Sequence, residues 1–233
     1  SSNDPLRGEE EDRINILLLG IGGEDHPGGT LTDTIMVASI KPSTKQVSLL
    51  SLPRDLVVKY YSDENPNYWE GLKINHSYVK GGAELADEKI EEVTGLPIHY
   101  HVLVDFYGFR KIIDDLGGVD VYIENSFTDR EYPNYNYGYQ TIAFKKGWER
   151  MTGERALQFA RSRHGNNGEG SDFGRSARQQ KILEAVKKKA FSLGTLLNPL
   201  KVGALMSDLG DHIQSNMEIW EMIQMADITQ NIS

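Results

Sequence analysis

The stretch "IHYHVLVDFYGFRKIIDDLGGVDVYI", residues 98–123, decides the fold class. Its first part, residues 98–106, is a short apolar run that predicts a strand. Residues 107–118 place apolar side chains at helical spacing and end at Gly117, which predicts a helix. Residues 119–123 predict a second short strand. Strand and helix in alternation indicate an α/β layered fold with a partly parallel sheet.

The rest of the chain continues this pattern. The run "INILLLG" at 14–20 predicts a buried strand, and 33–40 and 46–52 predict a hairpin joined by the turn residues "KPSTK". An exposed hairpin or loop is expected over 124–150. Helices are expected at 81–95, 152–163 with Thr152 as N-cap, 171–192, 199–209 and 217–227.

Composition limits the possible functions. The 233 residues carry a formal net charge of -9, which argues against general nucleic-acid binding. There is no cysteine, so disulfides, thiolate catalysis and Cys-ligated metals are excluded. No apolar run reaches the roughly 18 residues of a membrane-spanning helix. Residues 1–12 are polar and are expected to be a linker or terminal segment, and residues 13–233 are expected to form one domain.

Arginines gather on both sides of one glycine-rich loop in "RSRHGNNGEGSDFGRSARQQ", residues 161–180. Helical spacing places Arg175, Arg178 and Gln179 on neighbouring positions near a helix N-terminus, where backbone N–H groups favour an anion. Arg161 and Arg163 end the preceding helix. Guanidinium groups bind phosphate bidentately and stay charged. A single arginine more often pairs with a surface carboxylate, but this cluster predicts an oxyanion or phosphate site.

Two further segments are candidates for the same site. "SLPRD" places Arg54 and Asp55 at a strand end, a common location for ligand groups in open α/β sheets, although a local salt bridge would also explain them. Asp33 precedes a strand. It either caps a turn or binds Mg²⁺ together with substrate phosphate. Lys73 is either a cation at the rim of the site or a solvated surface lysine.

In this order the motifs resemble the LytR–CpsA–Psr family of cell-envelope phosphotransferases. The resemblance runs from about Ile14 to Ala190 and depends on the combination of "SLPRD", "KIN" followed by "GG", "LGGVDV" and "DFGRxxRQ". It implies a three-layer α-β-α sandwich with a mixed central sheet and a groove for polyprenyl lipid. It also implies a location at the extracellular face of the cytoplasmic membrane, with an N-terminal membrane anchor that would precede these residues.

The resemblance also implies an activity and its partners. Family members are taken to move a glycopolymer, such as teichoic acid or capsule, from a polyprenyl-pyrophosphate carrier to peptidoglycan. Mg²⁺ assists, and Mn²⁺ is a possible substitute. The implied catalytic residues are Arg54, Asp33, Arg161, Arg163, Arg175 and Gln179. Phosphate binding extends to Lys73 and Arg178, and the metal ligands are Asp33 and Asp25.

Two positions depart from the family pattern. Leu31 stands where the family commonly has arginine, and Gly22 stands where it commonly has aspartate. Asp25, in the longer loop that follows, is the candidate replacement for the missing carboxylate. The same loop is expected to compensate for Leu31 through His26 or through backbone N–H groups that form an anion-binding nest.

Three functions remain open at this point. The first is the phosphotransferase. The second is a hydrolase of polyprenyl or nucleotide pyrophosphate, in which water replaces the sugar hydroxyl. The third is a non-catalytic binder of lipid-linked glycan, a reading to which Leu31 lends weight. Apolar residues such as Ile90 and Ile113 are candidates for either core or lipid channel.

Overall fold

The computed structural model describes residues 4–232 and divides into two compact units. The first unit comprises the chain up to Phe106 together with the segment from Pro199 onward, and the second comprises Tyr107–Asn198. The single domain expected over residues 13–233 therefore stays a prediction. Of the expected terminal segment 1–12, residues 1–3 lie outside the described residues, and residues 4–12 form turns that bury Leu6 in the core.

The first unit is built on a five-stranded sheet in the order β11-β6-β1-β2-β3. Strands β1 and β6 are parallel, and the other neighbours are antiparallel, which confirms the mixed, partly parallel sheet. The strands of this unit are β1 (Ile14–Ile21), β2 (Thr32–Lys41), β3 (Gln46–Ser51), β4 (Val57–Tyr61), β5 (Trp69–Lys73), β6 (Tyr100–Asp105) and β11 (Ile213–Ser215). Its helices are η1 (Pro42–Thr44), η2 (Ile74–His76), α1 (Ser77–Thr94), α5 (Pro199–Leu209), η3 (Gly210–His212) and α6 (Ile219–Thr229).

Helices cover both faces of this sheet. Successive side chains of a strand point to opposite faces, so Leu17 of β1 packs in one cluster with Ile90 of α1. Ile16, its neighbour, packs in a second cluster with Met225 of α6. The first unit is thus a three-layer arrangement of helix, sheet and helix, as predicted. Ile90 belongs to the core.

Helix α1 differs from its expected start. It begins at Ser77 rather than at residue 81, and Gly81 and Gly82 interrupt it with non-helical backbone angles. Gly82 has a φ of 69°, which glycine adopts without strain. The "GG" of the motif therefore makes a kink inside a longer helical segment. Gly95 ends the helix in the left-handed conformation, as expected.

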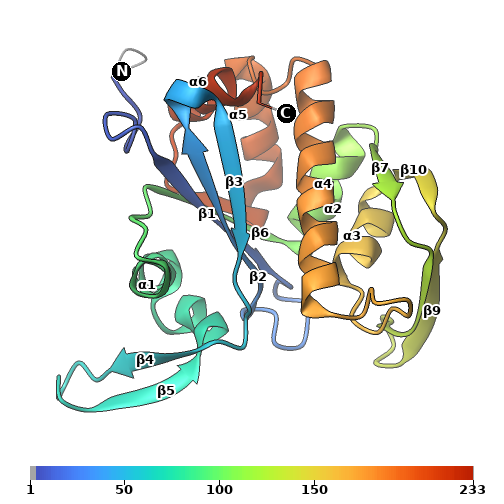
Figure 1. Cartoon of the computed structure of the whole chain (residues 1–233), viewed down its shortest axis with the longest axis horizontal. Helices are drawn as coiled ribbons and strands as arrows, with labels where there is room; N and C mark the ends of the chain where they lie inside the picture. The colour runs from blue at the N-terminus through green and yellow to red at the C-terminus, as the bar shows by residue number, and fades with distance from the viewer. Residues whose placement is uncertain (1–3, 233) are drawn as a thin grey trace. The chain divides into compact units, whose positions relative to one another are not determined.

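The strands β4, β5 and β11 were not predicted. β4 and β5 form an antiparallel hairpin that, in Figure 1, extends away from the five-stranded sheet. Its buried side includes Val58 and Tyr60, which join the cluster on the α1 face of the sheet.

The second unit packs its helices against two antiparallel strand pairs. It contains α2 (Phe106–Asp115), β7 (Val119–Ile123), β8 (Phe127–Pro133), β9 (Tyr139–Phe144), β10 (Gly147–Met151), α3 (Gly153–Arg161) and α4 (Asp172–Ser192). The strand pairs are β7 with β10 and β8 with β9. Phe127, Ile142 and Phe144 lie in its core beside Ile113 and Phe159. The hairpin expected within 124–150 is present as β8 and β9, but the expectation that it is exposed is wrong, because one of its faces supplies much of the core.

Both predicted helix starts in this unit are confirmed. The Thr152 hydroxyl accepts a hydrogen bond from Arg155 N at the start of α3, and the Ser171 hydroxyl accepts one from Gly174 N at the start of α4. Within residues 4–232 no helix has both the length and the apolar character to cross a bilayer.

Candidate functional site

Four charged side chains form a continuous row in the first unit, running from the start of β2 past the end of β3 to the end of β5. Arg54 Nη1 bonds to Asp33 Oδ1, and Arg54 Nε lies 3.9 Å from Asp55 Oδ2. The Lys73 ammonium lies 2.6 Å from Asp55 Oδ1. This strand-end row thus alternates acid and base, and the Arg54 and Asp33 side chains keep 26% and 33% of their surface exposed.

Backbone hydrogen bonds fix Arg54 in this position. β3 ends at Ser51, and Pro53, which has no N–H, prevents the strand from continuing in the ladder. The Leu56 N–H then donates to the Pro53 carbonyl and closes a turn. The buried Asn75 donates its N–H to the Arg54 carbonyl at 3.2 Å. The "PRD" and "KIN" motifs are therefore joined by a backbone hydrogen bond.

The glycine-rich loop after β1 is closed by its own hydrogen bonds. The N–H groups of Gly23, His26, Gly29 and Leu31 all donate to carbonyls inside the loop. These four N–H groups are therefore not available to an anion, and the expected backbone nest is not formed by them. The His26 ring packs edge-on against Phe106, with ring centroids 4.9 Å apart.

His26 also explains the glycine at position 22. A Cβ built on Gly22 would lie 2.8 Å from the His26 Cβ, closer than two such carbons approach in proteins. An aspartate at position 22 is thus incompatible with the position of His26 in this loop. The exposed Asp25 lies in the same loop.

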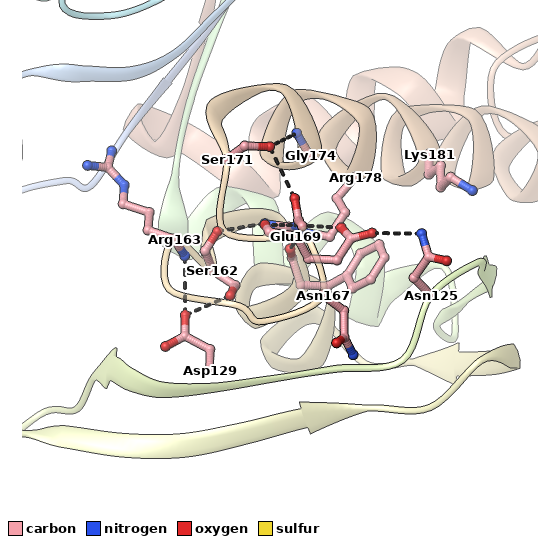
Figure 2. Close-up of polar contacts among 12 residues, drawn as sticks. Asn125, Asp129, Ser162, Arg163, Asn167, Glu169, Ser171, Gly174, Arg178 and Lys181 are labelled. Atoms are coloured by element: carbon pink, nitrogen blue, oxygen red, sulfur yellow. Dashed lines mark hydrogen bonds and ion pairs between the residues drawn. The ribbon is translucent and has the colours of Figure 1, made fainter.

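In the second unit, Arg178 braces the loop between α3 and α4 (Figure 2). Its Nε donates to the Phe159 carbonyl at 2.7 Å, and its Nη2 donates to the Ser162 carbonyl at 2.6 Å. Its Nη1 bonds to both the backbone carbonyl and the carboxylate of Glu169, each at 2.7 Å. Arg178 is 3% exposed, and all three of its guanidinium nitrogens bond to this loop, so its observed role is structural. Phosphate binding by Arg178 stays a prediction.

Asp129 of β8 holds the other side of the same loop. Its carboxylate accepts from the Ser162 hydroxyl at 2.6 Å and from the backbone N–H groups of Arg163 and His164, both at 3.2 Å. Burial raises the pKa of Asp129, but these bonds and one from Glu131 N outweigh burial and leave the pKa below its usual value. Sequence reasoning missed Asp129, because a single aspartate in a tyrosine-rich segment carries no distinguishing signal.

The remaining predicted residues surround this braced loop. Arg161 donates to the Tyr132 hydroxyl at 3.2 Å, and Gln179 donates to the Ala160 carbonyl at 3.3 Å. The buried Arg175 pairs with the exposed Asp172 at 3.0 Å. Figure 2 shows the Arg163 side chain extending away from the loop interior in which Arg178 lies. The convergence of these arginines with Arg54 stays a prediction.

The donors near Asp33 suit a weakly held Mg²⁺. Residues 4–232 contain no group of three or more acidic or histidine side chains placed to hold a metal. A metal at Asp33, whose side chain is 33% exposed, would therefore take most of its ligands from water and substrate. Mg²⁺ commonly binds in this manner, through one or two carboxylates plus phosphate oxygens. Asp33 fits this role if its ion pair with Arg54 opens and the carboxylate becomes available to the metal.

Comparison with known proteins gives one consistent result. The model of the LytR_cpsA_psr family matches residues 1–233. The polyisoprenyl-teichoic acid–peptidoglycan teichoic acid transferase TagU of Halalkalibacterium halodurans is 31% identical over 91% of this chain and 64% of its own length. TagV of Bacillus subtilis, named for the same activity, is 32% identical over 92% of this chain and 52% of its own length. The chain thus spans between about half and two-thirds of these two relatives.

The fold agrees with this result. The crystal structure of B. subtilis TagV superposes with a TM-score of 0.73 at 30% identity, covering 95% of this chain and 81% of that one. The motif order, the mixed sheet between helices and the match over the whole chain lead to one conclusion. The chain belongs to the LytR–CpsA–Psr family.

Proposed function

We propose that this chain is a glycopolymer–peptidoglycan phosphotransferase. The observation that carries the proposal is the partly exposed Arg54–Asp33 pair at the strand ends, in a family whose relatives are named as teichoic acid transferases. The donor is a glycopolymer on polyprenyl pyrophosphate, and the acceptor is a sugar hydroxyl of peptidoglycan. The protein works at the extracellular face of the cytoplasmic membrane, attached by an N-terminal anchor.

The reaction is a displacement at the glycan-linked phosphorus. The acceptor oxygen forms a P–O bond, the P–O bond to the pyrophosphate bridge breaks, and polyprenyl phosphate leaves with the bridging oxygen. The proton of the acceptor hydroxyl passes to solvent. Negative charge therefore grows on the leaving phosphate, and fixed cations that stabilise such charge are usually the largest catalytic contribution.

Each side chain has a place in this scheme. Arg54 exchanges Asp33 for a phosphate oxygen, and Arg161, Arg163 and Arg175 bind the remaining phosphate oxygens. Gln179 orients the bridge, and Lys73 adds positive charge at the rim. Asp33, with Asp25 as a second candidate, holds Mg²⁺ or Mn²⁺, which when bound would supply further positive charge at the phosphates. Arg178 and Asp129 hold the loop that carries Arg163.

The test uses the purified chain, a polyprenyl-pyrophosphate-linked glycan and isolated peptidoglycan. The expected result is release of polyprenyl phosphate together with covalent glycan on the peptidoglycan, lost on addition of EDTA and in Arg54→Ala. Release of polyprenyl phosphate and of free phosphorylated glycan, with no glycan attached to peptidoglycan, would instead make the protein a pyrophosphatase. Binding of the donor without any release would make the protein a binder of lipid-linked glycan.

A further inference from the structure

One face of the β4–β5 hairpin projects only exposed side chains. The register pairs Val57 with Lys73, Lys59 with Gly71 and Tyr61 with Trp69, which places these six residues on the same side. All six are exposed, whereas Val58 and Tyr60, on the opposite side, are buried. We call this exposed side the hairpin face.

The outer end of the hairpin face is an aromatic platform. Tyr61 and Trp69 form a cross-strand pair and are 55% and 47% exposed. The Lys59 ammonium lies 4.5 Å from the centroid of the Trp69 ring. A Cβ at Gly71 would lie 3.8 Å from the same ring, so the glycine adds no side chain against the indole. Apolar ring surface beside a cation suits a ligand with flat C–H surface and negative charge.

The inner end of the hairpin face meets the strand-end row. Lys73 is both the last residue of β5 and the partner of Asp55, which lies beside Arg54. Trp69 precedes Lys73 by four residues in β5, so the platform lies roughly 13 Å from Lys73 at the usual rise of a strand. A chain of several sugars can therefore run from the proposed phosphate site to Trp69.

Charge selects the kind of chain. The hairpin face carries Lys59 and Lys73 and no carboxylate. The turn beyond it, "SDENPN" at 62–67, carries Asp63 and Glu64 and no basic residue. Such a tip is repelled by an anionic membrane surface, whereas the Lys59 ammonium, and the Lys73 ammonium once it leaves Asp55, attract an anionic polymer that lies along the strands.

We propose that the hairpin face binds the anionic glycan chain of the donor, with a sugar on Trp69 and phosphodiester groups beside Lys59 and Lys73. This assignment rests on the proposed transfer reaction and adds to it the position of the donor chain. Chains with acidic groups at several positions would be favoured over neutral ones.

Binding is measured first without lipid or pyrophosphate. The probes are an oligosaccharide of phosphodiester-linked N-acetylglucosamine units, neutral chitotetraose, and vesicles containing phosphatidylglycerol. Trp69→Ala is expected to weaken binding of the phosphodiester probe at least about fivefold, because truncating an aromatic anchor usually costs this much. Trp69→Tyr should restore most of the binding of this probe. Lys59→Gln should make that binding less dependent on salt.

The matched control is Trp148→Ala, which removes another exposed tryptophan, 71% exposed, from the second unit. It is expected to leave binding unchanged. An equal loss in both variants, tighter binding of chitotetraose than of the phosphodiester probe, or binding to vesicles that depends on Trp69 would each overturn the proposal. Circular dichroism of Trp69→Ala shows whether the fold is kept, and Trp69→Tyr replaces it if it is not.

The transfer reaction separates this proposal from the function on which it rests. With a donor of one or two sugars, Trp69→Ala should match the wild type, because the chain does not reach the platform. With a donor of six or more units, the variant should show a raised KM and an unchanged kcat. An equal effect on both donors would overturn the assignment of the hairpin face. No transfer by the wild type would instead remove the proposed function.

Discussion

Arg54 and Asp33 form an ion pair that joins the end of β3 to the start of β2. Both side chains are about one-quarter to one-third exposed, so solvent screens the pair. Exposed pairs of this kind contribute about 0–1 kcal/mol to stability. The pair is therefore better placed to hold two functional groups than to stabilise the fold.

The first prediction is that Asp33→Ala keeps the fold and loses metal-assisted chemistry. Its melting temperature should stay close to that of the wild type, because the pair contributes little. Mg²⁺-dependent cleavage of a lipid pyrophosphate should fall by at least about 10²-fold, the usual effect of losing a group that acts at a developing charge. Thermal unfolding and phosphate release measure the two effects. Full activity that does not depend on metal would exclude Asp33 from the mechanism.

The second prediction separates two arginines of one motif. Arg178→Ala removes a buried cation that holds Glu169 and two carbonyls, so it should destabilise the protein by about 3–5 kcal/mol. Arg175→Ala removes a partner of the exposed Asp172 and should cost less stability but abolish most pyrophosphate cleavage. Urea unfolding and activity are measured on both. A soluble, stable Arg178→Ala protein with selective loss of substrate binding would assign Arg178 to the phosphate instead.

The third prediction concerns acid stability. Asp129 has a lower pKa in the folded protein than its ordinary value of 3.8, so the folded state binds fewer protons than the unfolded state. The stability that it contributes is therefore complete above about pH 4 and is lost as the pH falls through the folded-state pKa. Asp129→Asn should unfold more easily at pH 7 and lose less further stability between about pH 4 and 2.

Urea unfolding at several pH values provides the measurement. Asp120→Asn is a matched control, because Asp120 also has a lowered pKa but is exposed and pairs with Arg150. The control should change stability at pH 7 only slightly, because its exposed ion pair is screened by solvent. If both variants behave alike, Asp129 does not hold the loop in the way that the hydrogen bonds indicate.

Local physics made β1, β2, β3, β6, β7 and the capped helices predictable from the sequence. β1 is an apolar run between polar segments, and Thr152 and Ser171 accept hydrogen bonds from the first turns of their helices. The hairpin β4–β5 was not predicted, because its exposed aromatic residues hide the alternation of buried and exposed positions. Its register becomes clear only when Tyr60 packs against the core.

The candidate site was predictable as a set of residue types but not as a set of roles. Arg175 and Arg178 belong to the same motif and lie three residues apart. Which of them turns toward Phe159 and Ser162 depends on where α3 ends, which is a tertiary relationship. Asp129 was invisible for the same reason, since its partners come from more than 30 positions further along the chain.

The fourth prediction concerns the two departures from the family pattern at Leu31 and Gly22. Four N–H groups of the intervening loop are already bonded within it, so His26 is the first group to test for compensation of the missing arginine. His26→Ala should therefore lower pyrophosphate cleavage, and Leu31→Arg should change it little. If nothing compensates, Leu31→Arg should instead raise the rate by a sizeable part of about 10²–10³-fold.

The same loop provides the control. Gly22→Asp should disrupt it, because the new Cβ would lie 2.8 Å from the Cβ of His26. Removing that carbon with His26→Gly should relieve the contact, so the double variant should be more stable than Gly22→Asp alone. Thermal unfolding is measured on Gly22→Asp and on the double variant. Phosphate release is measured on these two and on His26→Ala and Leu31→Arg. A clear gain in Leu31→Arg with no loss in His26→Ala would rule out compensation, because it would show that the site lacks a cation that the loop does not supply.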